Sequence, residues 1–146
     1  MKRLLALVLL FACSSRRPDW AVTVAQGHSE ADHLLDSGNR AGARAVLEAI
    51  VAGAPDTGGE TRRVLLQDTL FRLARLALDE HDAAAAARHA DAGLALGGED
   101  DLFVANLLVV RGAAHEARGE SALALDVYQR ALRINEALLQ KTVSPP

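Results

Sequence analysis

The chain has 146 residues, enough for one domain with its own core but too few for two comfortable ones. Half of the residues are hydrophobic and only 3% are aromatic, so alanine, leucine and valine dominate the apolar content and favour helices over strands. The formal net charge of -3 gives no field that attracts phosphate backbones, which argues against nucleic-acid binding.

The first twelve residues have the pattern of an export signal. Lys2 and Arg3 precede an apolar run over residues 4–11, and a polar stretch over residues 14–18 follows it. Eight helical residues span only about 12 Å, whereas the hydrocarbon core of a bilayer is about 30 Å thick. We therefore predict a signal peptide over residues 1–12 rather than a membrane-spanning helix. The alternative is that this run is the first buried helix of the fold.

Cys13 is the only cysteine, so it cannot form an internal disulfide. The sequence Leu10-Phe11-Ala12-Cys13 resembles the lipobox of bacterial lipoproteins, although Phe11 is bulkier than the residue usual at that place. The resemblance implies cleavage after Ala12 and diacylglycerol on the Cys13 thiol, with acylation of the new amino group. Two or three acyl chains would anchor the protein stably. The alternative is an ordinary secretory signal with an incidental cysteine.

Two further expectations concern the segment after Cys13. By the same resemblance an aspartate at the next position would indicate retention in the inner membrane, so Ser14 favours the outer membrane, facing the periplasm. Residues 13–27 are expected to form the lipidated amino terminus and a flexible tether, because this stretch lacks helical periodicity. Trp20 would either rest at the membrane interface or pack on the domain, and the sequence leaves both open.

Residues 28–141 show helical periodicity interrupted by short polar stretches. The pattern predicts six helices, at about 28–37, 40–53, 61–80, 83–96, 101–118 and 121–141. The interruptions contain residues that stop and cap helices, including Ser37-Gly38-Asn39, Asp82 and Gly97-Gly98-Glu99-Asp100-Asp101. Residues 142–146 are expected to be a disordered tail. The predicted fold class is therefore all-α.

The helical segment also repeats itself. In one frame the third pair of helices carries Leu108, Gly112, His115, Gly119, Ala124, Tyr128, Ala131 and Leu132. The frame placed 38 residues earlier falls on Leu70, Ala74, Ala77, His81, Ala86, Ala90, Gly93 and Leu94. Moved back by 43 more, it falls on Gly27, Ala31, Leu34, Gly38, Ala43, Leu47, Ile50 and Val51.

This pattern of small, large and aromatic residues resembles the tetratricopeptide repeat. The resemblance implies three antiparallel helix-turn-helix hairpins stacked as a short right-handed solenoid. Residues expected to pack between its helices are Leu108, Gly112, Ala124, Tyr128, Ala131, Ala74 and Ala86. The sequence departs from the family in its longer spacing, in Ala90 at the aromatic position and in Glu136 at the terminal proline. The alternative is an ordinary α-helical bundle.

No catalytic or metal-binding motif is found. His28 and His33 are five residues apart, and His81 and His89 are eight apart, so neither pair has the four-residue spacing of ligands on one helical face. His115 is expected to pack between helices. We therefore expect no enzymatic activity, no metal and no cofactor.

The resemblance implies a binding groove formed by the first helix of each hairpin. The exposed positions expected there include His28, Asp32, Leu35, Asp68, Phe71, Arg72, Arg75, Asn106 and Val109. Phe71 beside Arg72 and Arg75 would hold an extended peptide and pair with its carboxylates. The alternative is that Phe71 belongs to the core and the arginines form a solvated face.

These observations predict a membrane-anchored lipoprotein that acts as a protein-interaction adaptor or assembly factor for a complex of the cell envelope. The sequence identifies neither the protein partner nor the oligomeric state. One alternative is a structural, self-assembling spacer without a peptide ligand. The other is a metal-binding or enzymatic lipoprotein.

Overall fold

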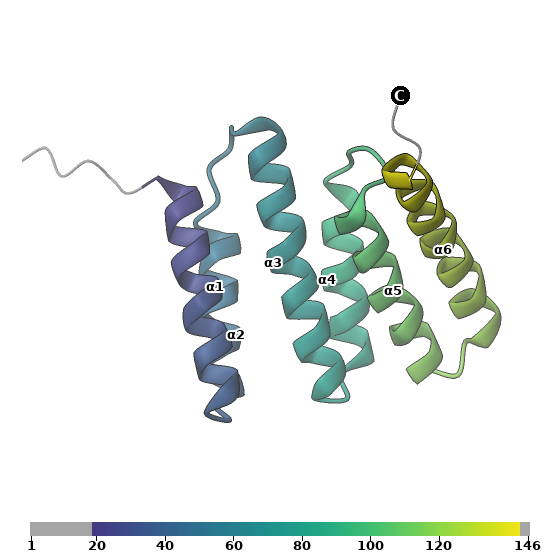
Figure 1. Cartoon of the computed structure of the whole chain (residues 1–146). Helices are drawn as coiled ribbons and strands as arrows, with labels where there is room; N and C mark the ends of the chain where they lie inside the picture. The colour runs from purple at the N-terminus through teal and green to yellow at the C-terminus, as the bar shows by residue number, and fades with distance from the viewer. Residues whose placement is uncertain (1–18, 144–146) are drawn as a thin grey trace, which may run out of the picture.

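The computed structural model describes residues 19–143, and these form six α-helices without a strand (Figure 1). They are α1 (Trp20–Asp36), α2 (Arg40–Ala52), α3 (Gly59–Asp79), α4 (Ala83–Ala95), α5 (Leu102–Ala117) and α6 (Ser121–Val143). The all-α prediction is thus confirmed. The predicted signal peptide and Cys13 lie outside the described residues, as do residues 144–146. No helix within residues 19–143 is both long and apolar enough to cross a bilayer.

Helix α1 begins eight residues earlier than the sequence suggested. The Asp19 carboxylate accepts a hydrogen bond from the Ala21 N–H at 3.2 Å and caps the helix, and both Val24 and Gly27 are buried. Trp20 packs against the hydrophobic core rather than standing apart from it. The prediction of a tether through residue 27 is therefore wrong for residues 20–27. At the other end α6 continues to Val143, so the first two residues of the predicted tail are helical.

Three later helices begin where the sequence supplies a capping side chain. Asn39 accepts from the Gly42 N–H at 2.9 Å, and Asp82 accepts from the Ala85 N–H at 2.8 Å. Asp101 accepts from two backbone N–H groups at the start of α5, at 2.9 and 3.0 Å. Each carboxylate or amide oxygen satisfies donors that have no partner inside the helix, which fixes the start of the helix.

The helices form an open row in which each packs mainly on its chain neighbours (Figure 1). The first helices of successive hairpins also touch, since α3 contacts both α1 and α5. By contrast, the backbones of α1 and α2 do not approach those of α4, α5 or α6 closely within the described residues. The core is correspondingly divided into clusters, the largest of which joins α1, α2 and α3, while another joins α5 and α6.

Small residues let neighbouring helices approach closely. A methyl group at Gly93 would lie 2.7 Å from a methyl carbon of Leu107, and one at Gly112 would lie 2.5 Å from the Tyr128 ring. Tyr128 lies along α5, and its hydroxyl donates to Glu116 at 3.0 Å. The other residues expected to pack between helices are all buried, namely Leu108, Ala124, Ala131, Ala74 and Ala86.

A buried polar network fixes the turn between α4 and α5. The Gln67 side chain is fully buried, and its amide donates to the carbonyl oxygens of Gly93 and Gly97 at 3.2 and 3.1 Å. Arg63 donates to the Gln67 side-chain oxygen at 2.5 Å and to Asp101 at 3.0 Å. These polar groups form hydrogen bonds with one another, so few of their atoms are buried without a partner. The network holds the glycine-rich turn against α3.

Replacement of Gly112 by alanine tests the close approach of α5 and α6. Gly112→Ala should lower the free energy of unfolding by up to about 2 kcal/mol. Overpacking destabilises by about 1–3 kcal/mol, and the higher helix propensity of alanine offsets about 1 kcal/mol of this. In the background of Tyr128→Ala the clash is absent, and the same change should stabilise the protein. Urea unfolding of the four chains measures both effects. An equal effect of Gly112→Ala in the two backgrounds would contradict this account of the interface.

Candidate functional site

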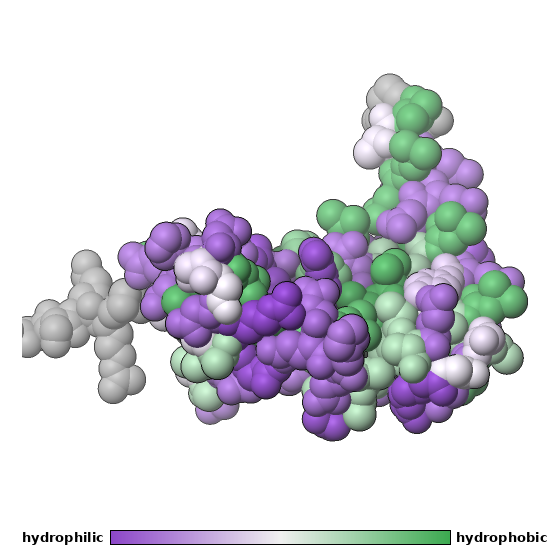
Figure 2. Space-filling model, turned by 90° about the horizontal axis from the view of Figure 1, so that it is seen from below, coloured by the Kyte–Doolittle hydropathy of each residue, from purple (hydrophilic) through white to green (hydrophobic). Residues whose placement is uncertain are grey.

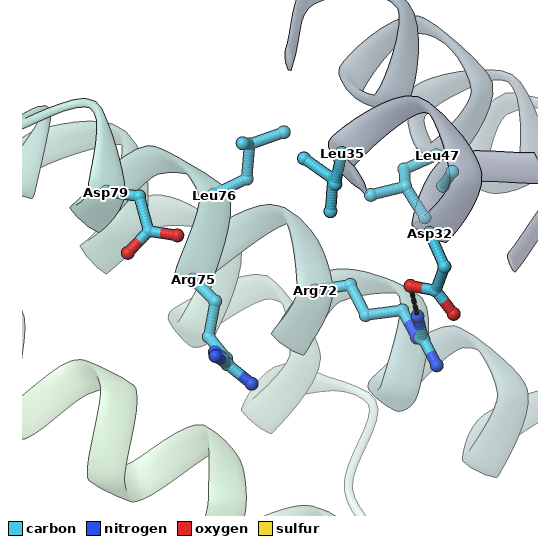
Figure 3. Close-up of a pocket in the computed structure, with 8 residues that line it drawn as sticks. Asp32, Leu35, Leu47, Arg72, Arg75, Leu76 and Asp79 are labelled. Atoms are coloured by element: carbon cyan, nitrogen blue, oxygen red, sulfur yellow. Dashed lines mark hydrogen bonds and ion pairs between the residues drawn. The ribbon is translucent and has the colours of Figure 1, made fainter. Parts of the chain in front are cut away.

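A groove between α1 and α3, which we call the α1–α3 groove, is the candidate binding site. It encloses about 200 Å³ and is lined by Ala31, Asp32, Leu35, Leu47, Arg72, Arg75, Leu76 and Asp79. Figure 3 shows Leu35, Leu47 and Leu76 converging between the helices, with charged side chains on both sides of them. Leu47 and Leu76 are buried and form the floor, while Leu35 is exposed at the rim. The groove therefore has an apolar floor with a charged border.

The two arginines of the groove have different surroundings. Arg72 forms ion pairs with Asp32 at 2.8 Å and with Asp68 at 3.3 Å, so its charge is already matched by α1 and by its own helix. Arg75 is exposed and forms no ion pair within residues 19–143, although its guanidinium lies 5.8 Å from the centre of the Phe71 ring. Arg75 is thus the cation of the groove that remains available to an anionic ligand.

The structure brings together only part of the predicted binding set. Phe71 packs with Leu78 against the cluster of Ala74, Ala90 and Val110, so it belongs to the interface with α4 and α5 and is not among the groove-lining residues. The interpretation of Phe71 as an apolar anchor for a peptide is replaced by a packing role. Its ring still contacts the Arg75 guanidinium from beside the groove.

The two predicted residues of α5 also lie apart from the groove. Asn106 is half-buried and Val109 is 43% exposed, and neither lines the cavity. Asp68 acts on the groove only through its ion pair with Arg72. The sequence analysis did not assign Leu76 and Asp79 to this site, although both stand four residues after a predicted arginine and therefore on the same helical face.

A polar cluster beside the groove joins α1 to α3. His28 Nε2 lies 2.9 Å from the Thr69 hydroxyl, and His28 Nδ1 lies 3.3 Å from an Asp68 oxygen. This order of hydroxyl, imidazole and carboxylate is the one used by nucleophilic hydrolases. Here, however, Thr69 is fully buried and its hydroxyl donates to the Leu65 carbonyl at 2.8 Å, so the oxygen is not presented to a substrate. The cluster serves as a cross-link between the two helices.

Burial lowers the pKa of His28, and the nearby Arg72 guanidinium adds to this effect. Asp68 and Asp32 oppose it, because their negative charges favour the imidazolium. Folding therefore favours the neutral form of His28 over the imidazolium, relative to the unfolded chain. Within residues 19–143, no group of three or more histidine, cysteine, aspartate or glutamate side chains is arranged to bind a metal ion.

Comparisons with protein-family models, with curated proteins and with solved structures gave no match to this chain. The interpretation of the α1–α3 groove therefore comes from its own residues and geometry.

The His28 cluster predicts a pH dependence of stability. Because the pKa of His28 is lower in the folded state than its ordinary value of about 6.5, the unfolded chain binds the proton first as the pH falls. The free energy of unfolding should then decrease as the pH falls below about 6.5. In His28→Gln this decrease should be smaller between pH 7 and pH 5, where burial of His89 still contributes.

Urea unfolding at several pH values measures this slope. His33→Gln, which changes an exposed histidine of the same helix, is the matched control. If His28→Gln and His33→Gln gave the same slope as the unmodified chain, the described role of His28 would be wrong.

Proposed function

We propose that this chain is a membrane-anchored helical-repeat lipoprotein whose α1–α3 groove binds a segment of another protein. The observation that carries the proposal is Arg75, an exposed guanidinium without a carboxylate partner in the described residues, beside an apolar floor of leucines. A guanidinium in this setting is a ready donor to a carboxylate. The bound protein would be a component of a cell-envelope complex.

The size and composition of the groove favour a peptide over a small molecule. A cavity of about 200 Å³ is smaller than the roughly 300–1,000 Å³ typical of pockets that enclose a drug-sized ligand. It can hold one apolar side chain above Leu35, Leu47 and Leu76. An aspartate or glutamate near that side chain would pair with Arg75, whereas Asp79 at the border would repel an anion placed too far along α3. The ligand is therefore an extended segment that combines an aliphatic and an acidic residue.

The proposed repeat architecture is a right-handed stack of three tetratricopeptide-like hairpins. Two observations support it. Successive hairpins contact one another in an open row, and small residues stand opposite large ones where helices meet, as Gly93 does opposite Leu107. In such a stack the first helices α1, α3 and α5 share one face, which is the face that carries the groove.

The proposed membrane anchor is lipid on Cys13. The support for it is the basic, apolar and lipobox pattern of the first thirteen residues. Because α1 begins at Trp20, only six residues separate the anchor from the helix, and they can reach at most about 25 Å. The first hairpin would then be held close to the outer membrane, on its periplasmic side.

Charge reversal at Arg75 tests the binding groove. Arg75→Glu should weaken binding of the partner by about tenfold or more, because the acidic ligand would meet a like charge. Arg88→Glu makes the same change at an exposed position of α4 outside the groove and should leave binding intact. The measurement is recovery of partners cross-linked in cells and purified with each tagged chain, followed by titration of the recovered partner. Equal binding by both variants would contradict the assignment of the groove.

Lipidation is tested separately. In a bacterial host supplied with labelled palmitate, the intact chain should carry the label and sediment with membranes, and Cys13→Ser should do neither. Ser14→Ala is the matched control, since it changes the neighbouring residue without removing the thiol. Labelling that persists in Cys13→Ser, or an unlabelled chain that remains inside the cell, would contradict the anchor.

A further inference from the structure

Helix α6 carries a second apolar face, which we call the α6 stripe. It consists of Leu125, Leu132, Leu139 and Val143, which are 59, 56, 63 and 71% exposed. Successive residues of the stripe are seven, seven and four positions apart, so they lie along one side of the helix. The residues that pack on α5 are different ones, centred on Val127 and Ala131. Figure 2 shows hydrophobic surface on the arm that ends at the carboxyl terminus, whereas hydrophilic surface prevails around the amino-terminal end.

The register of the hairpins shows what kind of surface this is. Leu125 and Leu132 stand 38 residues after Ala87 and Leu94 of α4. In α4 those two positions are partly buried, because Ala87 packs on a cluster that includes Ala114 of α5 and Leu94 packs on the cluster shared by α5 and α6. The same side of the preceding second helix is thus covered by another helix. Within residues 19–143 nothing covers it on α6, so the stripe has the geometry of a helix-docking face.

The opposite end of the row differs from this face in its exposed polar side chains. The outer surface of α1 presents Thr23, Gln26 and Glu30 at the rim of a groove that it forms with α2, whose lining also includes the apolar residues Trp20, Val46 and Ile50. Head-to-tail stacking of copies would bury these polar groups against leucines without hydrogen-bond partners, which is costly. The α6 stripe of a second copy is a better match, because leucine side chains would then pack against leucine side chains.

We propose that two copies of this chain pair through their α6 stripes, antiparallel about a two-fold axis at Leu132. The spacing makes the stripe self-complementary, because Leu125 and Leu139 stand seven residues before and after Leu132. Leu125 of one copy then faces Leu139 of the second copy. On one flank Gln129 comes opposite Glu136 of the second copy, where the amide can donate to the carboxylate. Antiparallel pairing also sets the opposite ends of the two helix dipoles side by side.

The size of the contact sets its strength. Helix α6 has 23 residues and is therefore about 35 Å long, and a helix face about 10 Å wide gives on the order of 350 Å² per copy. Both copies together bury on the order of 700 Å², less than the roughly 1,200–2,000 Å² of stable interfaces. The dimer is thus weak and depends on concentration. It uses the end of the row farthest along the chain from α1 and leaves the α1–α3 groove open, so it does not depend on the ligand proposed for that groove.

The test uses the chain from Asp19 to Pro146, which contains all six helices and every core cluster described and lacks the apolar run of residues 4–11. Sedimentation from about 1 µM to 1 mM should show a monomer–dimer equilibrium. Leu132→Glu should raise the dissociation constant at least tenfold. The matched control is Leu123→Glu, because Leu123 is 54% exposed on the same helix and lies roughly 180° around it from Leu132. It should leave the dissociation constant unchanged, and circular dichroism should show both variants folded.

Cysteine cross-linking identifies the axis. This shortened chain contains no cysteine, and a residue on a two-fold axis faces its own copy, so Leu132→Cys should form a covalent dimer on mild oxidation. Leu123→Cys should not. A chain that stays monomeric up to 1 mM, a dimer unaffected by Leu132→Glu, or equal cross-linking of the two cysteine variants would each overturn the proposal.

Discussion

The close approach of neighbouring helices is the constraint on which the rest of this structure depends. Few residues are aromatic, so the chain has few large side chains that could fill wide gaps between helices. Its helices therefore meet at positions where one of the two contributes almost no side chain. Gly93 receives Leu107, and Gly112 receives the ring of Tyr128. Such contacts allow close approach, because the distance between the axes of packed helices, about 8–10 Å, depends on the side chains at the contact. They also explain why each helix packs mainly on its chain neighbours, since the fit is made pair by pair along the row.

The α1–α3 groove lies where neighbouring helices are joined by polar and charged side chains rather than by closely packed apolar ones. Phe71 of α3 packs on an apolar cluster that includes Val110 of α5. Beside the groove, α1 and α3 are instead joined by polar side chains, with His28 bridging Thr69 and with Arg72 reaching Asp32. The backbones of α1 and α3 also approach one another over a shorter length than those of α3 and α5. The groove is the space that remains above the leucine floor, and its border is charged.

The sequence predicted the positions of α2 to α6 closely because their ends are marked by local chemistry, such as the capping side chains of Asn39, Asp82 and Asp101. The start of α1 was missed because residues 13–27 show no clear helical periodicity, whereas in the fold Val24 is buried and Gly27 gives room to Ile50. The side on which Phe71 packs could not be predicted either. A residue between two neighbouring helices can turn to either one, and periodicity fixes only the face of its own helix.

The two ends of the row differ in a way that limits how copies of the chain can associate. The outer surface of α1 is polar at Thr23, Gln26 and Glu30, as expected for the solvated end of a stack, while α6 ends the described row with an apolar stripe. A row with two apolar ends would add copies without limit and form fibres, because each addition would expose a new adhesive surface. The proposed pairing of two α6 stripes would cover this surface in both copies. The exposed polar side chains of α1 would then disfavour the addition of further copies at the other end of the row.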